Sequence, residues 1–425
     1  MAESYTISVP DSSVEDLKTR LSLARFPDEL DDAGWDYGSP LAEVKRLTAY
    51  WKDQFKWRKV ESELNKLPQF HTTITVPGFP PIDLHFLHQR SSNPDSIPLL
   101  FCHGWPGSYL EATKLLEPLT NSTASPSFHL VAPSLPNYAW SSGIKTRGFG
   151  LSQYATACHL LMQSLGYTRY VTQGGDWGFY ITRTMSLLYP ESCLATHINM
   201  IRAFPPSLST HPLLALSHAT TPYTEFEKRG LERSDWFANE GSGYKVLQCT
   251  KPQTPGYGVT DSPVGLLAWI LEKLHDWTDA YPWTDEEVCT WVSVYWFSRA
   301  GPAASFRIYY EATHDSVGAG DGGKDGGLPF TKRERTQEWI GGGVKVGLCY
   351  APKELSIVPR AWAGTLGEVV FVGQHESGGH FLAHERPEAI AGDLREMFGR
   401  GGPCKEVVRR VLGEMNEGMN TTVPT

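Results

Sequence analysis

Asp176 stands at the centre of the segment VTQGGDWGFYITR, residues 171–183, where a β-prone run gives way to a helix-like run. A strand-to-helix turn that pushes its central side chain outward needs small neighbours, because a Cβ atom there would collide with nearby backbone. Gly174, Gly175 and Gly178 are such neighbours. The pattern predicts a nucleophile elbow that carries a carboxylate where G-x-S-x-G hydrolases carry a serine. The same residues also fit an ordinary turn in which Asp176 caps the helix.

A nucleophile of this kind needs an acid and a base, which elbow hydrolases place after it on loops that follow late strands. Glu354 lies in APKEL after the strand-like KVGLCY, and His380 lies in GGHF after EVVFVG. A histidine there can be the general base near neutral pH, and a carboxylate on its other ring nitrogen would fix its tautomer. Glu354 alone also fits a solvated loop acid, and His375 and His384 compete with His380. The two glycines before His380 favour it, because they let the backbone approach the elbow.

The loop HGWPGS, residues 103–108, follows an apolar run and precedes a helix-like run. Elbow hydrolases build half of their oxyanion hole at this place. The backbone N–H of Trp105 would be one donor, and the N–H of Trp177, directly after the predicted nucleophile, would be the other. Pro106 has no N–H and cannot donate. Taken alone, the loop also fits a plain turn, but its place ahead of the elbow favours the oxyanion hole.

The composition limits the kinds of partner. The 425 residues are 40% hydrophobic, with a net charge of −9 and a pI near 5.9. Such a chain has no basic field for phosphates, which argues against nucleic acid or an anionic membrane and suits a neutral substrate better. The seven cysteines are scattered and show neither a disulfide nor a zinc pattern. With no apolar run of about 18 residues and no cationic, apolar start, the chain is predicted to be cytoplasmic, without a membrane anchor.

The elements around these residues alternate between helix and strand. Two helix-like patterns, the first capped by Ser12 or Ser13, precede two strands joined by a Pro-Gly turn. A strand, a loop and a helix follow, then a further strand and a helix stopped by Gly166. This alternation predicts an α/β fold with a mostly parallel, doubly wound sheet, in which function gathers at the carboxyl ends of the strands. The segments are residues 13–26, 41–67, 70–90, 97–119, 128–140 and 151–170.

The pattern changes at about residue 203 to proline-rich, aromatic and helical sequence, and the strand pattern resumes only at 344–355 and 367–381. We interpret 203–316 as a helical cap inserted into the sheet domain, and the Gly-rich stretch 317–330 as a flexible connector. The predicted division is therefore an N-terminal extension, a first core part, the cap, and a connector with the second core part: 1–90, 91–202, 203–316 and 317–425. Aromatic residues of the cap suggest an apolar substrate cavity, although about half should only pack: Trp269, Trp277, Trp283, Trp291, Trp296 and Phe297.

Seven short motifs occur in one order along nearly the whole chain: HGWPGS, GGDWG, SGYKVLQCTKP, DSPVGLLAWILEK, YYE, APKEL and GGHF. In this order they resemble the epoxide hydrolases of the α/β-hydrolase fold, in the branch similar to microsomal epoxide hydrolase. The region before residue 90 is similar to that branch's N-terminal extension. No N-terminal membrane anchor of the mammalian microsomal kind is present, which predicts a soluble relative.

The resemblance implies that two cap tyrosines donate hydrogen bonds to the epoxide oxygen. They fall on Tyr244 in SGYKVLQ and on Tyr309 in YYE, with Tyr310 as an adjacent competitor. Phenols with a pKa near 10 can polarise that oxygen and deliver a proton to the basic alkoxide. The predicted reaction is hydrolysis of an epoxide to a vicinal diol through an ester on Asp176. It uses a small apolar epoxide and water and needs no metal or organic cofactor; dimeric relatives make a homodimer one option.

Two other functions stay open at this point. A haloalkane dehalogenase also uses an elbow aspartate, but it needs halide-binding donors in place of the two phenols and lacks the N-terminal extension. A non-catalytic carrier or receptor for an apolar ligand would need no catalytic side chains, whereas here every catalytic position is filled. Halide release separates the first alternative from the predicted hydrolase, and tight binding without turnover would indicate the second.

Overall fold

A nine-stranded sheet forms the centre of the computed structural model, which describes residues 2–121, 123, 125–314, 324–325, 328–329 and 333–420. The strands lie in the order β1-β2-β3-β5-β4-β6-β7-β10-β11. Pairs from β1 to β5 are antiparallel, and the remaining pairs are parallel. The α/β fold predicted from the sequence is thus confirmed. The strands are Glu3–Ser4, Gln69–Ile74, Ile82–Gln89, Ile97–Cys102, Phe128–Pro133, Tyr170–Gly174, Cys193–Ile198, Ile340–Tyr350 and Gly367–Gln374.

Burial along the strands explains their places in the sheet. The runs IPLLFC of β4, FHLVAP of β5 and CLATHI of β7 are buried at every residue. Strands of a parallel sheet are covered on both faces, so their sequences read as continuous apolar runs. In β11 at the edge, buried and exposed residues alternate towards the end of the strand. The central strands therefore have both faces inside the core, and their carboxyl ends are where loops can carry chemistry.

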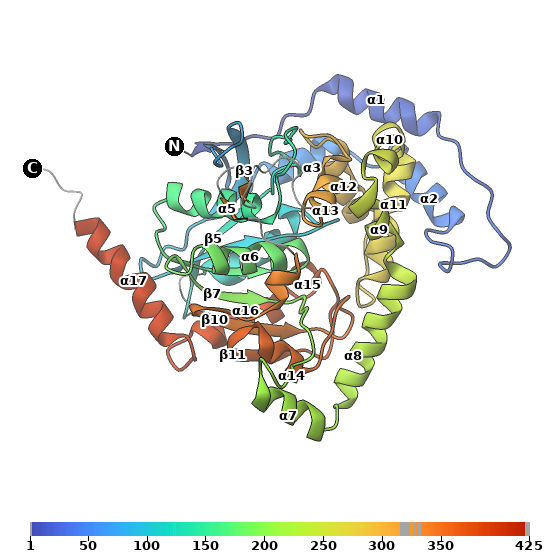
Figure 1. Cartoon of the computed structure of the whole chain (residues 1–425). Helices are drawn as coiled ribbons and strands as arrows, with labels where there is room; N and C mark the ends of the chain where they lie inside the picture. Colours follow the sequence, from blue (N-terminus) through green and yellow to red (C-terminus); the bar gives the residue numbers. More distant parts are fainter. Residues whose placement is uncertain are drawn as a thin grey trace, which may run out of the picture.

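Helices from three parts of the chain cover the sheet. Helices α5 (Leu151–Ser164) and α6 (Trp177–Leu188) pack against each other, and α6 follows β6 directly. The C-terminal helix α17 extends to the left of the sheet in Figure 1. The predicted helix after HGWPGS is instead a 3-10 helix, Tyr109–Leu115, that continues into α4 (Leu116–Thr120). The remaining helices of this layer are α14 (Arg360–Ala363), α15 (Leu382–Glu385), α16 (Pro387–Phe398) and α17 (Lys405–Asn420).

Residues 203–311 contain helices and no strand, as the sequence predicts. Helices α7 to α13 are called the cap helices below, and α8 to α13 stand together to the right of the sheet in Figure 1. Two of these helices begin with a capping box, which is formed by Thr224 and Glu227 in α8 and by Thr284 and Glu287 in α12. The cap helices are Pro212–Thr220, Glu225–Trp236, Gly243–Thr250, Gln253–Asp261, Pro263–Asp276, Asp285–Trp296 and Arg307–Glu311.

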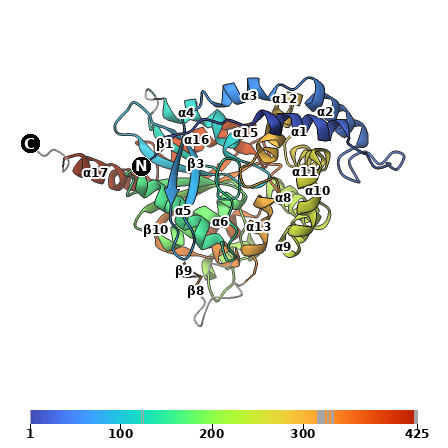
Figure 2. The same ribbon diagram turned by 90° about the horizontal axis from the view of Figure 1, so that it is seen from above.

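The N-terminal helices α1 (Asp11–Ser22), α2 (Leu41–Asp53) and α3 (Trp57–Leu64) run along the cap helices α11 and α12, as Figure 2 shows. The Trp51 indole donates to Ser293 Oγ at 3.0 Å, and the Arg20 guanidinium pairs with the Asp261 carboxylate at 2.8 Å. Trp51 is buried. The first 70 residues thus join the cap to the strands β1 and β2 that begin the sheet.

Two local predictions were wrong. The single helix expected over 41–67 breaks between α2 and α3, where Lys56 is extended. Phe55 and Trp57 are both buried there, and residues two apart point to different sides of a continuous helix, so the break lets both reach the core. The first helix begins at Asp11 after Pro10, without the expected serine cap. Residues 382–398 form two helices, and the break falls at Arg386, the residue before Pro387, where φ is −140° and ψ is 64°.

Most of the predicted connector, residues 317–330, lies outside the described residues. Within it, β8 (Lys324–Asp325) and β9 (Leu328–Pro329) form an antiparallel pair. In the part of the chain that the structure describes, no helix is both long and apolar enough to cross a bilayer.

Candidate active site

Asp176 lies in a strained turn between β6 and α6, with φ 51° and ψ −122°. A non-glycine residue adopts such a φ only when its surroundings force it. A Cβ atom at Gly178 would lie 1.9 Å from the Cys102 carbonyl oxygen, and one at Gly104 would lie 2.3 Å from the Asp176 Cβ. The elbow therefore packs against the loop after β4 so closely that only glycine fits. Asp176 makes no side-chain capping bond, so its carboxylate is left to face the site.

Glu354, His380 and Asp176 come together at the carboxyl ends of β10, β11 and β6. The Nδ1 atom of His380 lies 2.5 Å from Glu354 Oε1, and its Nε2 atom lies 3.5 Å from Asp176 Oδ2. Asp176 is the least covered of the three, with 15% of its side chain exposed against 2% for each of the others. This arrangement can pass a proton between His380 and whatever lies at the Asp176 carboxylate.

Backbone hydrogen bonds hold the acid and the base in place. The N–H of Leu355 donates to Glu354 Oε1 at 2.7 Å, and the Asn199 amide donates to Glu354 Oε2 at 3.4 Å. The N–H of His380 donates to the Trp277 carbonyl at 2.7 Å. A Cβ atom at Gly379 would lie 2.4 Å from that same carbonyl oxygen, so the glycine before His380 is needed for the approach.

The charges around His380 determine its protonation state. Burial disfavours the imidazolium, but the carboxylates of Glu354 and Asp176 outweigh burial and raise the pKa of His380 from 6.5 to about 10. His380 is therefore protonated at neutral pH. If Asp176 became an uncharged ester, one of the two charges that raise the pKa would disappear and His380 could release its proton.

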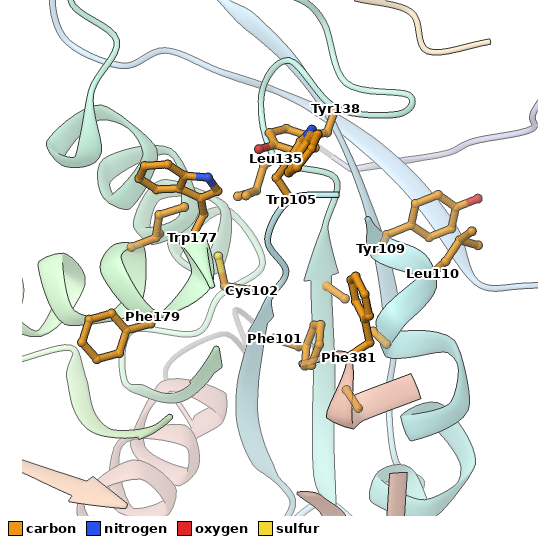
Figure 3. Packing of buried hydrophobic residues seen from close by; sticks show 14 of the residues in the cluster. Phe101, Cys102, Trp105, Tyr109, Leu110, Leu135, Tyr138, Trp177, Phe179 and Phe381 are labelled. Carbon is orange, nitrogen blue, oxygen red and sulfur yellow. The ribbon is translucent and has the colours of Figure 1, made fainter. Parts of the chain in front are cut away.

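The loop HGWPGS reaches the elbow from the end of β4. The N–H of Trp105 donates to Asp176 Oδ1 at 2.8 Å, and Figure 3 shows Trp105 and Trp177 near each other beyond Cys102. Two aromatic side chains of α12 support the loop: the Trp291 indole donates to the Pro106 carbonyl at 2.6 Å, and the Tyr295 hydroxyl donates to the Gly107 carbonyl at 2.6 Å. The Trp105 amide thus lies at the Asp176 carboxylate, while the role of the Trp177 amide stays a prediction.

Tyr244 of α9 and Tyr309 of α13 are buried and face the same cavity as Asp176. Tyr244 stacks on Trp105, with ring centroids 5.0 Å apart, and Tyr309 meets Trp177 edge to face at 4.8 Å. Burial raises the pKa of both phenols well above 10, so both are neutral donors. Among the described residues, the Tyr309 hydroxyl makes no hydrogen bond of normal geometry, but it interacts with the Tyr244 side chain, which helps to raise its pKa. Tyr310, the competitor, stacks on His314 at 3.9 Å instead.

The cavity between Asp176 and the two tyrosines has a volume of about 30 Å³, close to the share of one molecule in liquid water. Ligand cavities are usually at least tenfold larger, so an epoxide enters only when side chains of the cap move. None of the six aromatic residues expected at the substrate cavity lines it in this state. Trp277, for example, packs edge to face on His380 at 5.1 Å. Trp269 lines a separate pocket that also contains Tyr244, so the contact of these rings with substrate stays a prediction.

Sequence reasoning missed two groups of residues at the site. Burial raises the pKa of Glu111 to about 8, and the carboxyl group lies so close to Gly107 that a Cβ atom there would meet it at 1.6 Å. The N–H of Gly104 also faces this acid. Three cationic side chains, those of Arg202, Lys245 and Arg333, line the cavity as well. No motif marks either group, because an isolated Glu or Arg carries no local pattern.

A separate cluster of His197, Cys349 and Asp393 has the composition of a metal site, with ligand atoms within 4.8 Å of one another. Asp393 already accepts hydrogen bonds from His197 at 3.3 Å and from His375 at 3.1 Å. The two other histidines that the sequence offered as general base have different partners. His375 bonds to Asp393, and His384 Nε2 lies 3.5 Å from Glu287 Oε1.

The fold and the site together define an α/β hydrolase, with an acidic elbow after β6, an acid after β10 and a histidine after β11. Family models match in two parts of the chain. The model described as alpha/beta hydrolase fold matches residues 97–222, and the model described as epoxide hydrolase N terminus matches residues 2–112.

Similar proteins identify the family within this class of hydrolase. A protein of Stigmatella aurantiaca assigned to the epoxide hydrolases is 36% identical over 405 residues, which cover 93% of this chain and 84% of that one. Epoxide hydrolase 1 of Oryctolagus cuniculus is 29% identical over 425 residues, or 93% and 88% of the two chains. The structure of Aspergillus niger epoxide hydrolase matches with a TM-score of 0.77 at 31% identity, covering 97% of each chain. The chain belongs to the epoxide hydrolase family and is a hydrolase of that kind.

Proposed function

We propose that the enzyme opens an epoxide by attack of Asp176 on a ring carbon, which forms a covalent ester. The C–O bond of the ring breaks, and its electron pair stays on the oxygen. The observation that carries the proposal is the single cavity shared by Asp176, Tyr244 and Tyr309. It sets a nucleophile opposite two neutral proton donors, whose side chains interact with each other. Holding these groups in place can lower the barrier by roughly 7 to 11 kcal/mol.

The two phenols then donate hydrogen bonds to the oxygen that leaves the attacked ring carbon. An alkoxide is strongly basic, so a proton must reach it as the ring opens. Tyr244 and Tyr309 lie on different helices with ring centroids 6.0 Å apart. One oxygen between them can accept from both hydroxyl groups, and one of the phenols gives up its proton. The phenols act in this step only, because the second step takes place at the ester carbonyl.

Hydrolysis of the ester uses the sheet side of the site. Formation of the ester removes the charge of Asp176, so His380 can lose its proton and return the phenolate to a phenol. Neutral His380, held by Glu354, then takes a proton from water, and the water oxygen attacks the ester carbonyl carbon. The amides of Trp105 and Trp177 stabilise the oxyanion. As this intermediate collapses, the bond between the carbonyl carbon and the substrate oxygen breaks. The departing oxygen takes a proton from the His380 imidazolium, and His380 then takes the remaining proton of the added hydroxyl, so that a vicinal diol leaves and the Asp176 carboxylate is restored.

A His380→Gln variant tests the covalent step. It retains the nucleophile and both phenols but lacks the base, so the ester should accumulate. With styrene oxide, intact-protein mass spectrometry should show one added epoxide mass, located on the peptide that contains Asp176. Diol formation at the wild-type rate without an adduct would contradict the proposal. An Asp176→Ala variant is the matched control and should show neither adduct nor diol.

The domain division expected from the sequence is part of this proposal. In it, residues 1–90 brace the cap, 91–202 and 317–425 supply the nucleophile, acid and base, and 203–316 supplies the phenols. Contacts of Trp51 and Arg20 with cap residues support the bracing role. Limited proteolysis that releases residues 1–90 while the remainder keeps full activity would contradict it.

A further inference from the structure

Three cationic side chains line the cavity that holds Asp176: Arg202, Lys245 and Arg333. They come from separate segments. Arg202 follows β7, Lys245 lies in α9 directly after Tyr244, and Arg333 begins the 3-10 helix Arg333–Gln337. All three are partly buried. The fold therefore gathers three positive charges at the one place where the substrate must lie.

Few carboxylates lie close to these three cationic side chains. Among the described residues, neither Arg202 nor Lys245 has a carboxylate within 4.0 Å, and Arg333 reaches only Glu334, at 3.9 Å, whose side chain is 58% exposed. Asp176 is the carboxylate that lines the cavity, and it is already engaged by the Trp105 amide and by His380. The cavity wall thus carries more positive than negative charge.

The arrangement is unfavourable without an added anion. Burial, together with the neighbouring charges of Arg202 and Arg333, lowers the pKa of Lys245 to about 8. Like charges in a partly desolvated wall repel one another, and an anion between them would reverse that effect. The overall charge of −9 says nothing about this local field, since the acidic residues lie elsewhere on the chain.

We propose that Arg202, Lys245 and Arg333 bind a carboxylate carried by the substrate, so that the enzyme prefers epoxides bearing an acid group over neutral ones. The proposal rests on the epoxide hydrolysis proposed above and names its substrate class. Guanidinium groups bind a carboxylate through two parallel hydrogen bonds, and an ammonium adds a point charge. Because Lys245 adjoins Tyr244, the carboxylate would be anchored on the side of the cavity where the ring oxygen meets its proton donor.

The cations could instead act on the chemistry itself. Burial and the charge of Asp176 raise the pKa of Tyr244, and the charge of Arg202 opposes that rise. In that role the cations would make the phenol a stronger acid for every epoxide, charged or neutral. The two roles therefore predict different results when one epoxide is offered as a free acid and as its methyl ester.

The test compares kcat/KM for diol formation from pairs of epoxy acids and their methyl esters, in a series of increasing distance between ring and carboxylate. At the best length, the wild-type enzyme should prefer the acid by about tenfold or more, the effect of one charge-assisted hydrogen bond. Lys245→Gln and Arg202→Gln should each lower the acid-to-ester ratio about tenfold. Added salt should lower the rate with the acid and not with the ester. Lys251→Gln, at the exposed end of α9, is the matched control and should change neither rate.

Three results would overturn the inference. If the esters are hydrolysed as fast as the acids at every length, the cations do not select a carboxylate, although the enzyme remains an epoxide hydrolase. If the variants slow acid and ester equally, the cations act through the phenols. If neither acids nor esters give diol while neutral aryl epoxides are also inert, the proposed function itself fails and this inference with it.

Discussion

Asp176, Glu354 and His380 come from the sheet side of the site, whereas Tyr244 and Tyr309 come from its cap side. On the sheet side, backbone amides and a left-handed turn fix the catalytic groups: Trp105 donates to Asp176, and Leu355 donates to Glu354. On the cap side, ring contacts fix the phenols, through Trp105 for one and Trp177 for the other. The two sides meet through the same pair of tryptophans.

This difference has consequences for function. Backbone hydrogen bonds and a strained turn allow little movement, which suits the proposed roles of Asp176 as nucleophile and His380 as base. Ring stacking is less directional, so the cap can move to admit substrate and pack again around it. The cavity of about 30 Å³ is too small for an epoxide, so binding needs such movement. Substitutions on the rigid sheet side and on the adaptable cap side should therefore affect different steps of the reaction.

Removal of the nucleophile should have the largest effect. Asp176→Ala leaves the cap side and the base intact but removes the atom that forms the ester, so kcat should fall by roughly 10⁶-fold. Steady-state diol formation measures it, and the circular dichroism spectrum should match that of wild type. Retention of activity would remove Asp176 from its assigned role.

The acid of the sheet side should come next. Glu354→Gln keeps the shape of the side chain but removes the charge that raises the pKa of His380 and fixes its tautomer, so kcat should fall by up to about 10⁴-fold. Ester formation needs neither effect, so rapid-quench measurements should show a normal first step and a slow second step. A slowed first step would show that Glu354 serves the nucleophile instead.

Loss of one phenol should cost less, because the other remains. Tyr309→Phe should lower kcat/KM by roughly 10²-fold, the usual contribution of one general acid. In contrast to Glu354→Gln, it should slow ester formation and leave hydrolysis of the ester unchanged. Tyr310→Phe is the matched control, since its ring stacks on His314, and it should be near wild type. Equal losses in both variants would contradict the choice of Tyr309.

The protonation of His380 predicts a pH dependence of stability. The folded protein holds the His380 proton up to about pH 10, whereas an unfolded histidine loses it near 6.5. This contribution to the free energy of unfolding is therefore complete below about pH 6.5 and is lost as the pH rises towards 10. Denaturant unfolding of wild type and His380→Gln should converge over that interval. A constant difference across it would contradict the assigned charge state.

The smallest effect concerns the strained turn alone. Asp176→Ala and Asp176→Gly both remove the carboxylate, but only glycine adopts φ 51° without strain. Asp176→Gly should be the more stable of the two by about 1 kcal/mol. Equal midpoints in chemical denaturation would show that the sheet-side turn stores no strain.

The same contrast explains what the sequence could predict. The sequence predicted the elbow because tight backbone contact demands glycine at fixed positions around Asp176. It predicted Glu354 and His380 because they follow strands in a fixed order. The phenols left no such pattern, since stacking accepts many neighbours, and Tyr244 and Tyr309 came from the family resemblance. The cationic wall could not be predicted, because Arg202, Lys245 and Arg333 meet only in the folded chain. The break between α2 and α3 was missed because periodicity continues across it.

The covalent ester on Asp176 is the central claim, and a single-turnover reaction in ¹⁸O-labelled water with enzyme in excess tests it most directly. If Asp176 attacks the ring, its own oxygen leaves in the first diol, so that diol should be unlabelled and ¹⁸O should appear in the Asp176 carboxylate. Label in the diol of the first turnover, with none in Asp176, would mean that water attacks the epoxide directly and would contradict the account.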